Sequence, residues 1–201
     1  LGDINNDNHI DAVVANGRHW PEENYVFYNY GKGFNSMIAL GNTNSTSYAA
    51  ELVDLDNDGD LDILEINDNA PHKIYLNNGN GDFKFYSQVA TISNARNVSL
   101  GDLDNNGFID FIITNRGQQN MICYNQGKLE FECNHLETNQ NSTIDIAIKD
   151  LNNDGLLDLV LANRDNIPNE IFLGTGNKQF KKKLEFGSGS FESRSVSVAD
   201  L

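Results

Sequence analysis

The sequence predicts an all-β protein built from about four copies of one small antiparallel sheet. Three observations support this prediction. An acidic nine-residue motif recurs along the chain, with its lead Asp residues 48 to 51 positions apart. A short apolar run follows every full copy, and Gly- and Asn-rich turns separate the remaining strand signals. A repeat of this length is typical of architectures in which each unit buries its apolar faces against its neighbours.

The motif is clearest at residues 54–62, where oxygen-bearing side chains occupy positions 1, 3, 5 and 9 and Gly occupies position 6. Carboxylates this close repel one another unless a cation lies among them, so the motif predicts a loop for a hard divalent ion. Position 7 would add its backbone carbonyl, and position 6 needs the left-handed backbone that Gly or Asn adopts most easily. The candidate ligands are Asp3, Asn5, Asp7, His9, Asp11, Asp54, Asp56, Asp58, Asp60, Asp62, Asp102, Asp104, Asn106, Phe108, Asp110, Asp150, Asn152, Asp154, Leu156 and Asp158, with His9, Asp60, Phe108 and Leu156 acting through the backbone carbonyl.

We predict about four bound Ca²⁺ ions, one for each full motif. Ca²⁺ accepts a flexible shell of oxygen ligands, whereas Mg²⁺ demands a stricter octahedral one. An EF-hand opens in the same way but ends with a Glu at position 12 and enters a helix, while these loops end at position 9 and enter an apolar strand. Asx-rich turns without metal are the other alternative. The second loop has four ligand carboxylates where the others have three and an Asn, so we expect it to bind most tightly.

Each repeat carries the same strand signals in the same order. A first strand precedes the loop at residues 47–53, 96–101, 143–149 and 194–199, and a second, strongly apolar strand follows it at residues 10–15, 61–66, 109–114 and 156–162. Consecutive apolar residues at 111–113 and 159–162 predict strands that are covered on both faces. The loop therefore lies between the first and second strands of each repeat.

Two further strands complete each repeat. An Asn follows the second strand every time, where it can bond the nearby backbone as the chain turns, at Asn16, Asn67, Asn115 and Asn163. The third strands are predicted at residues 25–28, 73–76, 121–124 and 170–173, and a Gly/Asn turn then leads to a fourth strand. The fourth strand opens on Phe34, Phe83, Phe131 or Phe180, which we expect to be core anchors between neighbouring units.

No segment has a helical period, and Pro occurs three times. Meanders of four short strands at this spacing are typical of propeller blades. We therefore predict a β-propeller of about four blades at residues 1–46, 47–94, 95–141 and 142–192, with residues 193–201 beginning a further repeat. The first blade lacks its own first strand, which residues 194–201 would supply in a closed ring. A piece of a longer array is the alternative that we favour.

The loop Asp-x-Asp-x-Asp-Gly-x-x-Asp, its apolar strand and the later Gly-x-Gly-x-Phe turn resemble the FG-GAP/VCBS repeats of integrin α-subunit-like β-propellers. Residues 54–62 with Gly79, Gly81 and Phe83 are the best match, and the resemblance extends over essentially the whole chain. It implies a calcium-binding propeller that engages ligands through loops at the blade ends or clefts between blades. Full propellers of this family have more blades than this chain supplies.

The charge is strongly acidic, with 29 Asp and Glu against 14 Lys and Arg and a formal net charge of −15. Many of these acids are the candidate ligands, so the acidity fits metal chemistry. The chain lacks the basic patch that a nucleic-acid partner requires. Its one basic run, Lys181 to Lys183, is expected to be a solvated strand end. No apolar run is long enough to predict a membrane span.

The sequence also argues against an enzyme. The four His residues are scattered, lack a partnered nucleophile motif, and are expected on the surface or in loops: His9, His19, His72 and His135. The carboxylate pairs all have metal spacing, which leaves none free for acid–base work. No Gly-rich phosphate loop occurs. A non-catalytic module is the leading hypothesis.

We expect this module to bind a glycan or an extracellular protein. The variable segments 17–25, 67–72, 115–120 and 163–169 all follow the second strand, so they would cluster on one rim. The first contains the single Trp, Trp20, with Arg18 and Tyr25 as further candidate ligand-binding residues. Trp20 either stacks on a sugar ring or packs at a blade edge, and we favour packing.

Three features predict a secreted or cell-surface location. Loops of this kind bind Ca²⁺ at extracellular concentrations. Cys123 and Cys133 flank a hairpin turn and form either a disulfide or two buried thiols. Candidate glycosylation sites occur at Asn44, Asn97 and Asn141. The alternative functions are a structural or assembly subunit of a surface protein or filament, and an accessory domain of a secreted enzyme. The partners would then be the rest of a longer propeller or other copies of the chain.

Overall fold

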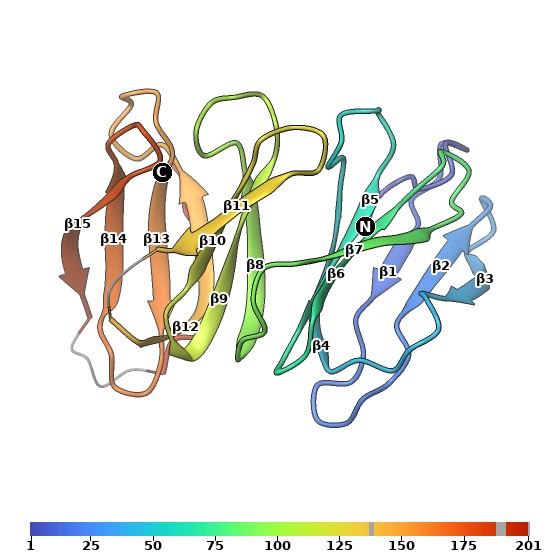
Figure 1. Ribbon diagram of the computed structural model, residues 1–201, viewed down its shortest axis with the longest axis horizontal. Coiled ribbons are helices and arrows are strands. Elements are labelled where there is room, and N and C mark those ends of the chain that lie inside the picture. The colour runs from blue at the N-terminus through green and yellow to red at the C-terminus, as the bar shows by residue number, and fades with distance from the viewer. Residues whose placement is uncertain (137–138, 188–191, 201) are drawn as a thin grey trace. The chain divides into compact units, whose positions relative to one another are not determined.

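The computed structural model describes residues 1–136, 139–187 and 192–200, and the chain forms two compact units, residues 1–95 and 96–201. All regular secondary structure in the described residues is β-strand, numbered β1 to β15 (Figure 1). No helix that could span a bilayer occurs in this described part of the chain. The predicted all-β class is therefore confirmed.

The first unit contains two antiparallel sheets with strands in chain order. One consists of β1 (Ala12–Val14), β2 (Tyr25–Asn29) and β3 (Phe34–Ala39). The other consists of β4 (Ser47–Val53), β5 (Asp62–Asn67), β6 (His72–Leu76) and β7 (Lys84–Val89). The first sheet lacks a first strand, as the sequence predicts.

The second unit forms an eight-stranded antiparallel sheet composed of two four-stranded meanders. The first meander consists of β8 (Ala95–Gly101), β9 (Asp110–Gln118), β10 (Met121–Asn125) and β11 (Phe131–His135), and the second of β12 (Asn141–Lys149), β13 (Asp158–Asn163), β14 (Asn169–Gly174) and β15 (Phe180–Phe186). The ends of β9 and β12 join them, where Asn141 pairs with Gln118 and Ser142 with Arg116. The predicted order of strand, loop, strand, strand, turn and strand is confirmed in all three complete repeats.

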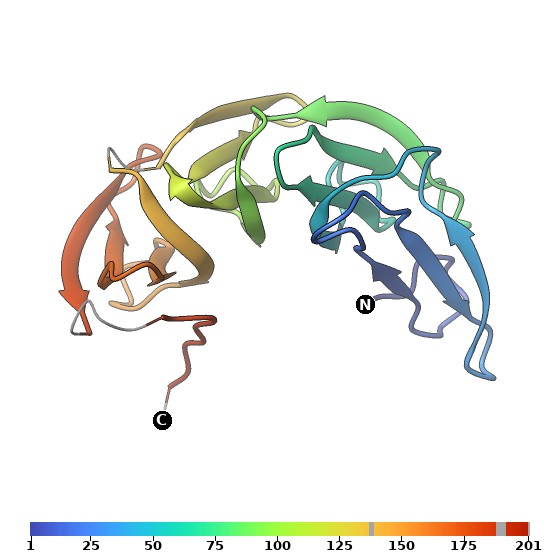
Figure 2. The same ribbon diagram turned by 90° about the horizontal axis from the view of Figure 1, so that it is seen from below.

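The predicted strand at residues 194–199 is wrong, because residues 192–200 contain no strand (Figure 2). In the complete repeats the first strand pairs with the second strand of the same repeat. The described residues offer no such second strand after Asp200. The Asp145 carboxylate holds this segment instead, accepting hydrogen bonds from Ser195 Oγ and Val196 N, both at 3.0 Å.

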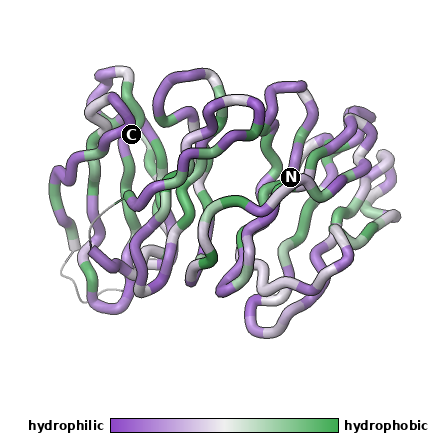
Figure 3. The backbone as a smooth tube through the Cα atoms, viewed as in Figure 1, coloured by the Kyte–Doolittle hydropathy of each residue, from purple (hydrophilic) through white to green (hydrophobic). Residues whose placement is uncertain are grey.

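The second strands form the centre of each complete meander. Every residue of β5 and β13 is buried, as are the first six of β9, and these strands carry much of the apolar sequence (Figure 3). Coverage of both faces is thus confirmed. In the first unit Ile63 and Tyr75 share one core with Val26 and Tyr28. In the second unit Ile112 and Tyr124 share another with Leu159.

The predicted Phe anchors behave differently in different repeats. Phe83 packs against the core shared by the two sheets of the first unit, and Phe180 packs against the core of the second. The Phe131 ring lies 5.4 Å from that of Phe111. The prediction is wrong for Phe34, which is 52% exposed. Phe34 opens β3 of the three-stranded sheet.

Buried polar side chains connect neighbouring sheets within each unit. In the first unit Asn24 Nδ2 donates to Ser47 Oγ at 2.7 Å, and Ser47 Oγ donates to Asn67 Oδ1 at 2.6 Å. In the second, Asn120, Thr143 and Asn163 form the same relay at 2.7 and 2.8 Å. These hydroxyls both accept and donate, so the relay satisfies groups that would be costly to bury alone. Asn67 and Asn163, two of the four Asn residues predicted to mark the strand exit, are the buried acceptors of these relays.

The prediction for His72 is also wrong, since this residue lies fully buried in β6 rather than on the surface. Its Nδ1 accepts the Asn67 N–H at 3.1 Å. Asn24 Oδ1 and Asn120 Oδ1 accept the corresponding N–H of Asn16 and Asn115 in other repeats, at 2.7 and 2.8 Å. His72 therefore replaces an Asn of the repeat. Burial lowers the pKa of His72 to about 4, so the side chain is neutral at pH 7.

We expect His72 to make the first unit sensitive to acid. Its folded-state pKa lies below the unfolded value of about 6.5, so stability is fully present above pH 6.5 and is lost as the pH falls toward 4. Between pH 7 and pH 5 the parent should lose about 2 kcal/mol of unfolding free energy more than His72→Asn loses. Urea unfolding followed by amide NMR signals of residues 1–95 measures this difference.

The variant His72→Asn is matched to the repeat, because Asn accepts the same backbone N–H elsewhere in the chain. Carboxylates distant from His72 titrate equally in parent and variant, so their contribution cancels, and Glu65, which interacts with the imidazole, belongs to the effect being measured. Equal losses in the two proteins would show that His72 does not carry the acid sensitivity.

Candidate metal centre and ligand-binding loop

All four acidic loops fold in the same way. The carboxylate at position 1 accepts backbone N–H groups from positions 5 and 6, as Asp54 does from Asp58 at 3.2 Å and Gly59 at 3.0 Å. The same pair of bonds occurs in the other three loops, at 2.8–3.3 Å. The side chains at positions 3 and 5 accept the N–H groups two residues further on. These bonds turn the acidic side chains toward the inside of the loop.

The backbone confirms the predicted role of position 6. Gly59, Gly107 and Gly155 have φ of 95°, 88° and 84°, and Asn8 has φ of 67°. Position 4 is also left-handed in every loop, a feature that the spacing of the acidic residues does not predict. Its residues are Asn6, Asn57, Asn105 and Asn153, with φ between 59° and 61°.

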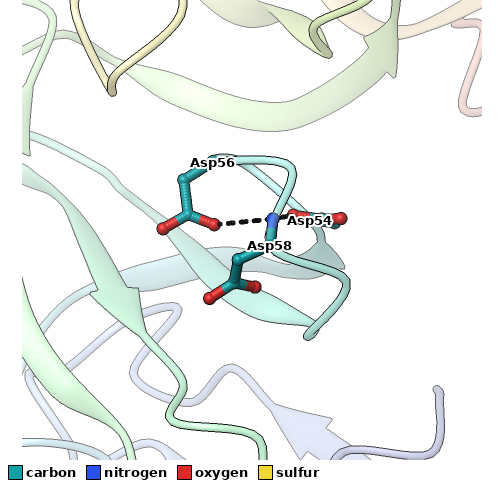
Figure 4. Close-up of side chains that lie close together, drawn as sticks. All are labelled: Asp54, Asp56 and Asp58. Carbon is teal, nitrogen blue, oxygen red and sulfur yellow. Dashed lines mark hydrogen bonds between the residues drawn. The ribbon is translucent and has the colours of Figure 1, made fainter.

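The second and third loops bring carboxylates together. In the second, Asp54, Asp56 and Asp58 offer oxygen atoms that all lie within 4.8 Å of one another (Figure 4). In the third, Asp102, Asp104 and Asp110 do the same. A set of several carboxylate oxygens around one point is the donor chemistry that Ca²⁺ prefers. The residues present therefore fit the ion that the resemblance implies.

The Asp at position 9 does more than the sequence suggests. Asp62 is buried, and its Oδ2 accepts the Leu55 N–H at 3.1 Å while its Oδ1 accepts the Asn77 N–H at 3.0 Å. The other three loops repeat both bonds at 2.7–3.0 Å through Asp11, Asp110 and Asp158. One carboxylate thus ties the loop to the hairpin turn after the third strand. Each oxygen keeps a further lone pair with which it could bind a cation.

Burial and neighbouring groups shift the pKa values of several carboxylates in these loops. Burial raises the pKa of Asp62 and of Asp110 to about 6, although each accepts two backbone N–H bonds. Burial and the neighbouring Asp58 also raise the pKa of Asp56. In the more open fourth loop, donation from the Gly155 N–H lowers the pKa of Asp150. The carboxylates of the second and third loops are therefore the closest together, and each loop contains one whose pKa is raised to about 6.

The remaining candidate ligands also lie in these loops, but with other partners. Asn106 Nδ2 donates to Asn125 O at 2.8 Å, and Asn152 Nδ2 donates to Asp154 Oδ2 at 3.0 Å. Asp104 lies 3.5 Å from Lys178 Nζ, which places a competing cation beside the third loop. The fully acidic second loop has no such neighbour among the described residues.

The candidate ligand loop of residues 17–25 presents Trp20 to solvent. Trp20 is 76% exposed, so the expected packing at a blade edge is not found within the described residues. Arg18 lies 5.8 Å from the Tyr48 ring centre, and Tyr25 Oη donates to Glu23 at 2.7 Å. The two other candidates are therefore engaged within the protein, while Trp20 offers its face.

Backbone contacts hold this loop against the segment before β4. Glu22 and Ser45 exchange backbone hydrogen bonds at 3.0 and 2.9 Å. Gly17 has φ of 92°, and a Cβ there would lie 2.1 Å from Ser45 O. Only Gly fits this approach, so the loop is built into the sheet rather than loosely attached.

The structure places the two cysteines and the three candidate glycosylation sites. Cys123 and Cys133 are directly opposite each other on β10 and β11 and form a disulfide. Asn44 is exposed. Asn97 Nδ2 donates to Asp145 at 2.9 Å, and Asn141, which is buried, donates to Glu170 at 2.7 Å. Because a glycan attaches at this nitrogen, it would compete with these bonds at Asn97 and Asn141, and glycosylation at all three Asn residues stays a prediction.

Two cavities lie in the second unit. One of about 440 Å³ is lined by Tyr124, Glu132, His135 and Lys178, among others. The other, of about 610 Å³, is lined by the predicted basic run, residues 181–183, beside the fourth acidic loop. Lys182 reaches the buried Glu170 at 2.6 Å. The basic run is exposed, as predicted, but it is not simply a solvated strand end.

Sequence reasoning missed the buried relay between sheets and the N–H donors of the hairpin turns. Ser47 and Thr143 stand seven residues before their lead Asp, and a search for polar residues at fixed repeat offsets would have found them. The hydrogen-bond partners of the Asn at position 4 could not be found in this way, because they lie in the next repeat. Asn6, for example, donates to Asp60 and Gly79.

Comparison with known proteins agrees with this geometry. The family described as FG-GAP-like repeat matches residues 3–65, 54–113 and 150–201. A solved structure of an Agrocybe aegerita lectin, described as specifically recognising non-reducing terminal N-acetylglucosamine, is similar with a TM-score of 0.52 and 17% identity. The similarity covers 88% of this chain and 52% of the lectin, so the chain spans about half the lectin's length.

None of the curated proteins matches the chain. The similarity to the lectin concerns the fold, since the identity is low. The family matches, by contrast, cover most of the chain and include all four acidic loops. The chain belongs to the FG-GAP-like repeat family.

Proposed function

We propose that the chain is a non-catalytic, calcium-stabilised extracellular module that binds glycans. Calcium would be held by the four acidic loops, and the glycan by the loop that carries Trp20. The single observation that carries the calcium assignment is the convergence of three carboxylates in the second loop. The disulfide between β10 and β11 supports an oxidising compartment.

The role of calcium would be structural. The ion would neutralise carboxylates that otherwise repel one another, and the loop residues at positions 1, 3 and 5 would hold it. Position 9 already ties the loop to the hairpin turn through Asp62 and its equivalents. Fixing the loop would therefore also fix the second and third strands. We expect dissociation constants of roughly 10⁻⁴–10⁻³ M, as in other extracellular modules.

The second loop should bind calcium most tightly. It has four ligand carboxylates, while the third loop has an Asn in the set and Lys178 nearby. Asp56→Ala should therefore weaken the tightest calcium-binding step by at least roughly tenfold, and Asp104→Ala should weaken it less. Isothermal titration of the parent and both variants compares them. An equal or larger effect of Asp104→Ala would contradict the ranking.

The glycan assignment depends on Trp20. A ring that is 76% exposed on a well-anchored loop presents a flat apolar face beside polar groups. Aromatic faces of this kind stack on the apolar face of a sugar. The similar lectin is described as recognising terminal N-acetylglucosamine, so this sugar belongs in the first set of ligands to test.

Trp20→Ala should abolish binding on a glycan array, or weaken it at least roughly tenfold, because stacking is the main contact proposed. Tyr30→Ala is the matched control, since Tyr30 is also an exposed aromatic, 57% accessible, but lies in another turn. Unchanged binding of Trp20→Ala would move the site elsewhere. Absence of any glycan binding by the parent would reject the ligand class.

A further inference from the structure

The left-handed Asn at position 4 reaches from one acidic loop into the next. In the first unit Asn6 Nδ2 donates to Asp60 Oδ1 at 3.0 Å and to Gly79 O at 3.1 Å. In the second unit Asn105 Nδ2 donates to Gly155 O at 3.4 Å, a longer bond. Both pairs of neighbouring loops within a unit are thus connected by the same residue of the repeat.

The acceptors lie where they can affect the next loop. Asp60 is at position 7 of the second loop, and its backbone carbonyl is a candidate ligand. Gly155 is at position 6 of the fourth loop, directly before the carbonyl-bearing Leu156. In each case the donated hydrogen bond restrains the part of the loop that must turn its carbonyl toward the ion.

The donor is positioned by its own loop. Asn6 lies between positions 3 and 5, whose side chains are candidate ligands, and its φ of 60° is one that few residues other than Asn and Gly adopt readily. A cation held at positions 3 and 5 would fix the backbone of position 4. This would fix the direction in which the amide points.

We propose that Asn6 and Asn105 are positioning residues that couple calcium binding between neighbouring loops, so that filling one loop raises the affinity of the next. The inference rests on the calcium binding proposed above. A ligand that orders one element lowers the cost of ordering a second element that contacts it. Because coupling is reciprocal, each loop of a pair should respond to the other.

Calcium titration of the whole chain, followed by backbone amide NMR, tests this loop by loop. The signals of Gly59 and Gly155 report the second and fourth loops. Asp7→Asn removes a ligand charge from the first loop and should lower the affinity read at Gly59 by roughly fivefold. Asn6→Gly keeps the left-handed backbone without the amide, and should lower it by a similar factor.

The decisive comparison is the double variant. In Asn6→Gly the additional change Asp7→Asn should cause no further loss at Gly59, because the connection is already broken. Asn105→Gly should weaken binding at Gly155 by a smaller factor, since its bond is longer. Asn153→Gly is the matched control: Asn153 has the same position and a φ of 59°, but its side-chain amide has no partner among the described residues. The variant Asn153→Gly should leave the calcium affinity read at Gly59 unchanged.

The outcomes separate this inference from the proposed function. If the loops saturate but Asp7→Asn leaves Gly59 unaffected, binding is independent and the coupling is rejected while calcium binding stands. If Asp7→Asn lowers the calcium affinity at Gly59 as much in Asn6→Gly as in the parent, Asn6 does not couple the two loops. If no loop shows a saturable shift, both the coupling and the calcium assignment fail.

Discussion

Each repeat depends on one buried carboxylate at the ninth loop position. Asp62 and its equivalents accept one N–H from the start of the acidic loop and another from the turn after the third strand. A buried ionised group is costly to bury unless it is fully hydrogen-bonded, and these bonds meet that requirement. The same group lies at the start of the central strand, so loop, central strand and hairpin turn are fixed together. The rest of the acidic loop is arranged around this anchor.

Neighbouring sheets within a unit are connected by two kinds of contact. Apolar side chains such as Ile63 and Tyr75 share a core with the adjacent sheet, which supplies most of the burial. The relay from Asn24 through Ser47 to Asn67 fixes how the two sheets align, because hydrogen bonds form only when each hydroxyl and amide faces its partner. Where the relay changes, its members change together: His72 takes the place of the Asn, and Ala95 takes the place of the hydroxyl residue. The His72 imidazole still accepts the Asn67 N–H, so this buried donor stays satisfied.

Much of the fold could be predicted from the sequence because the same strand and loop signals recur in every repeat. The bounds of β4 agree with the prediction, and the left-handed position 6 follows from Gly59 and its equivalents. The failures have a common cause, since they concern contacts with another element. Phe34 is 52% exposed while its equivalents Phe83 and Phe180 pack against a core, and residues 194–199 form no strand but are held by the distant Asp145. The surface prediction for His72 is wrong because the sequence does not distinguish a buried neutral imidazole from an exposed one.

The candidate site shows the same division between local and distant information. Ligand types and spacing are local, so the sequence could identify the acidic loops. The second role of Asp62 and the reach of Asn6 are set by residues 15 and 54 positions away, which no spacing rule reveals. A loop that is anchored by its own carboxylate, and restrained by its neighbour, requires little reorganisation to accept a cation. Trp20 stands on a loop that is likewise anchored to the sheet through Gly17 and Ser45. The acidic loops and the Trp20 loop are thus tied to the strands by hydrogen bonds, and such preorganisation lowers the cost of ordering a loop when a ligand binds.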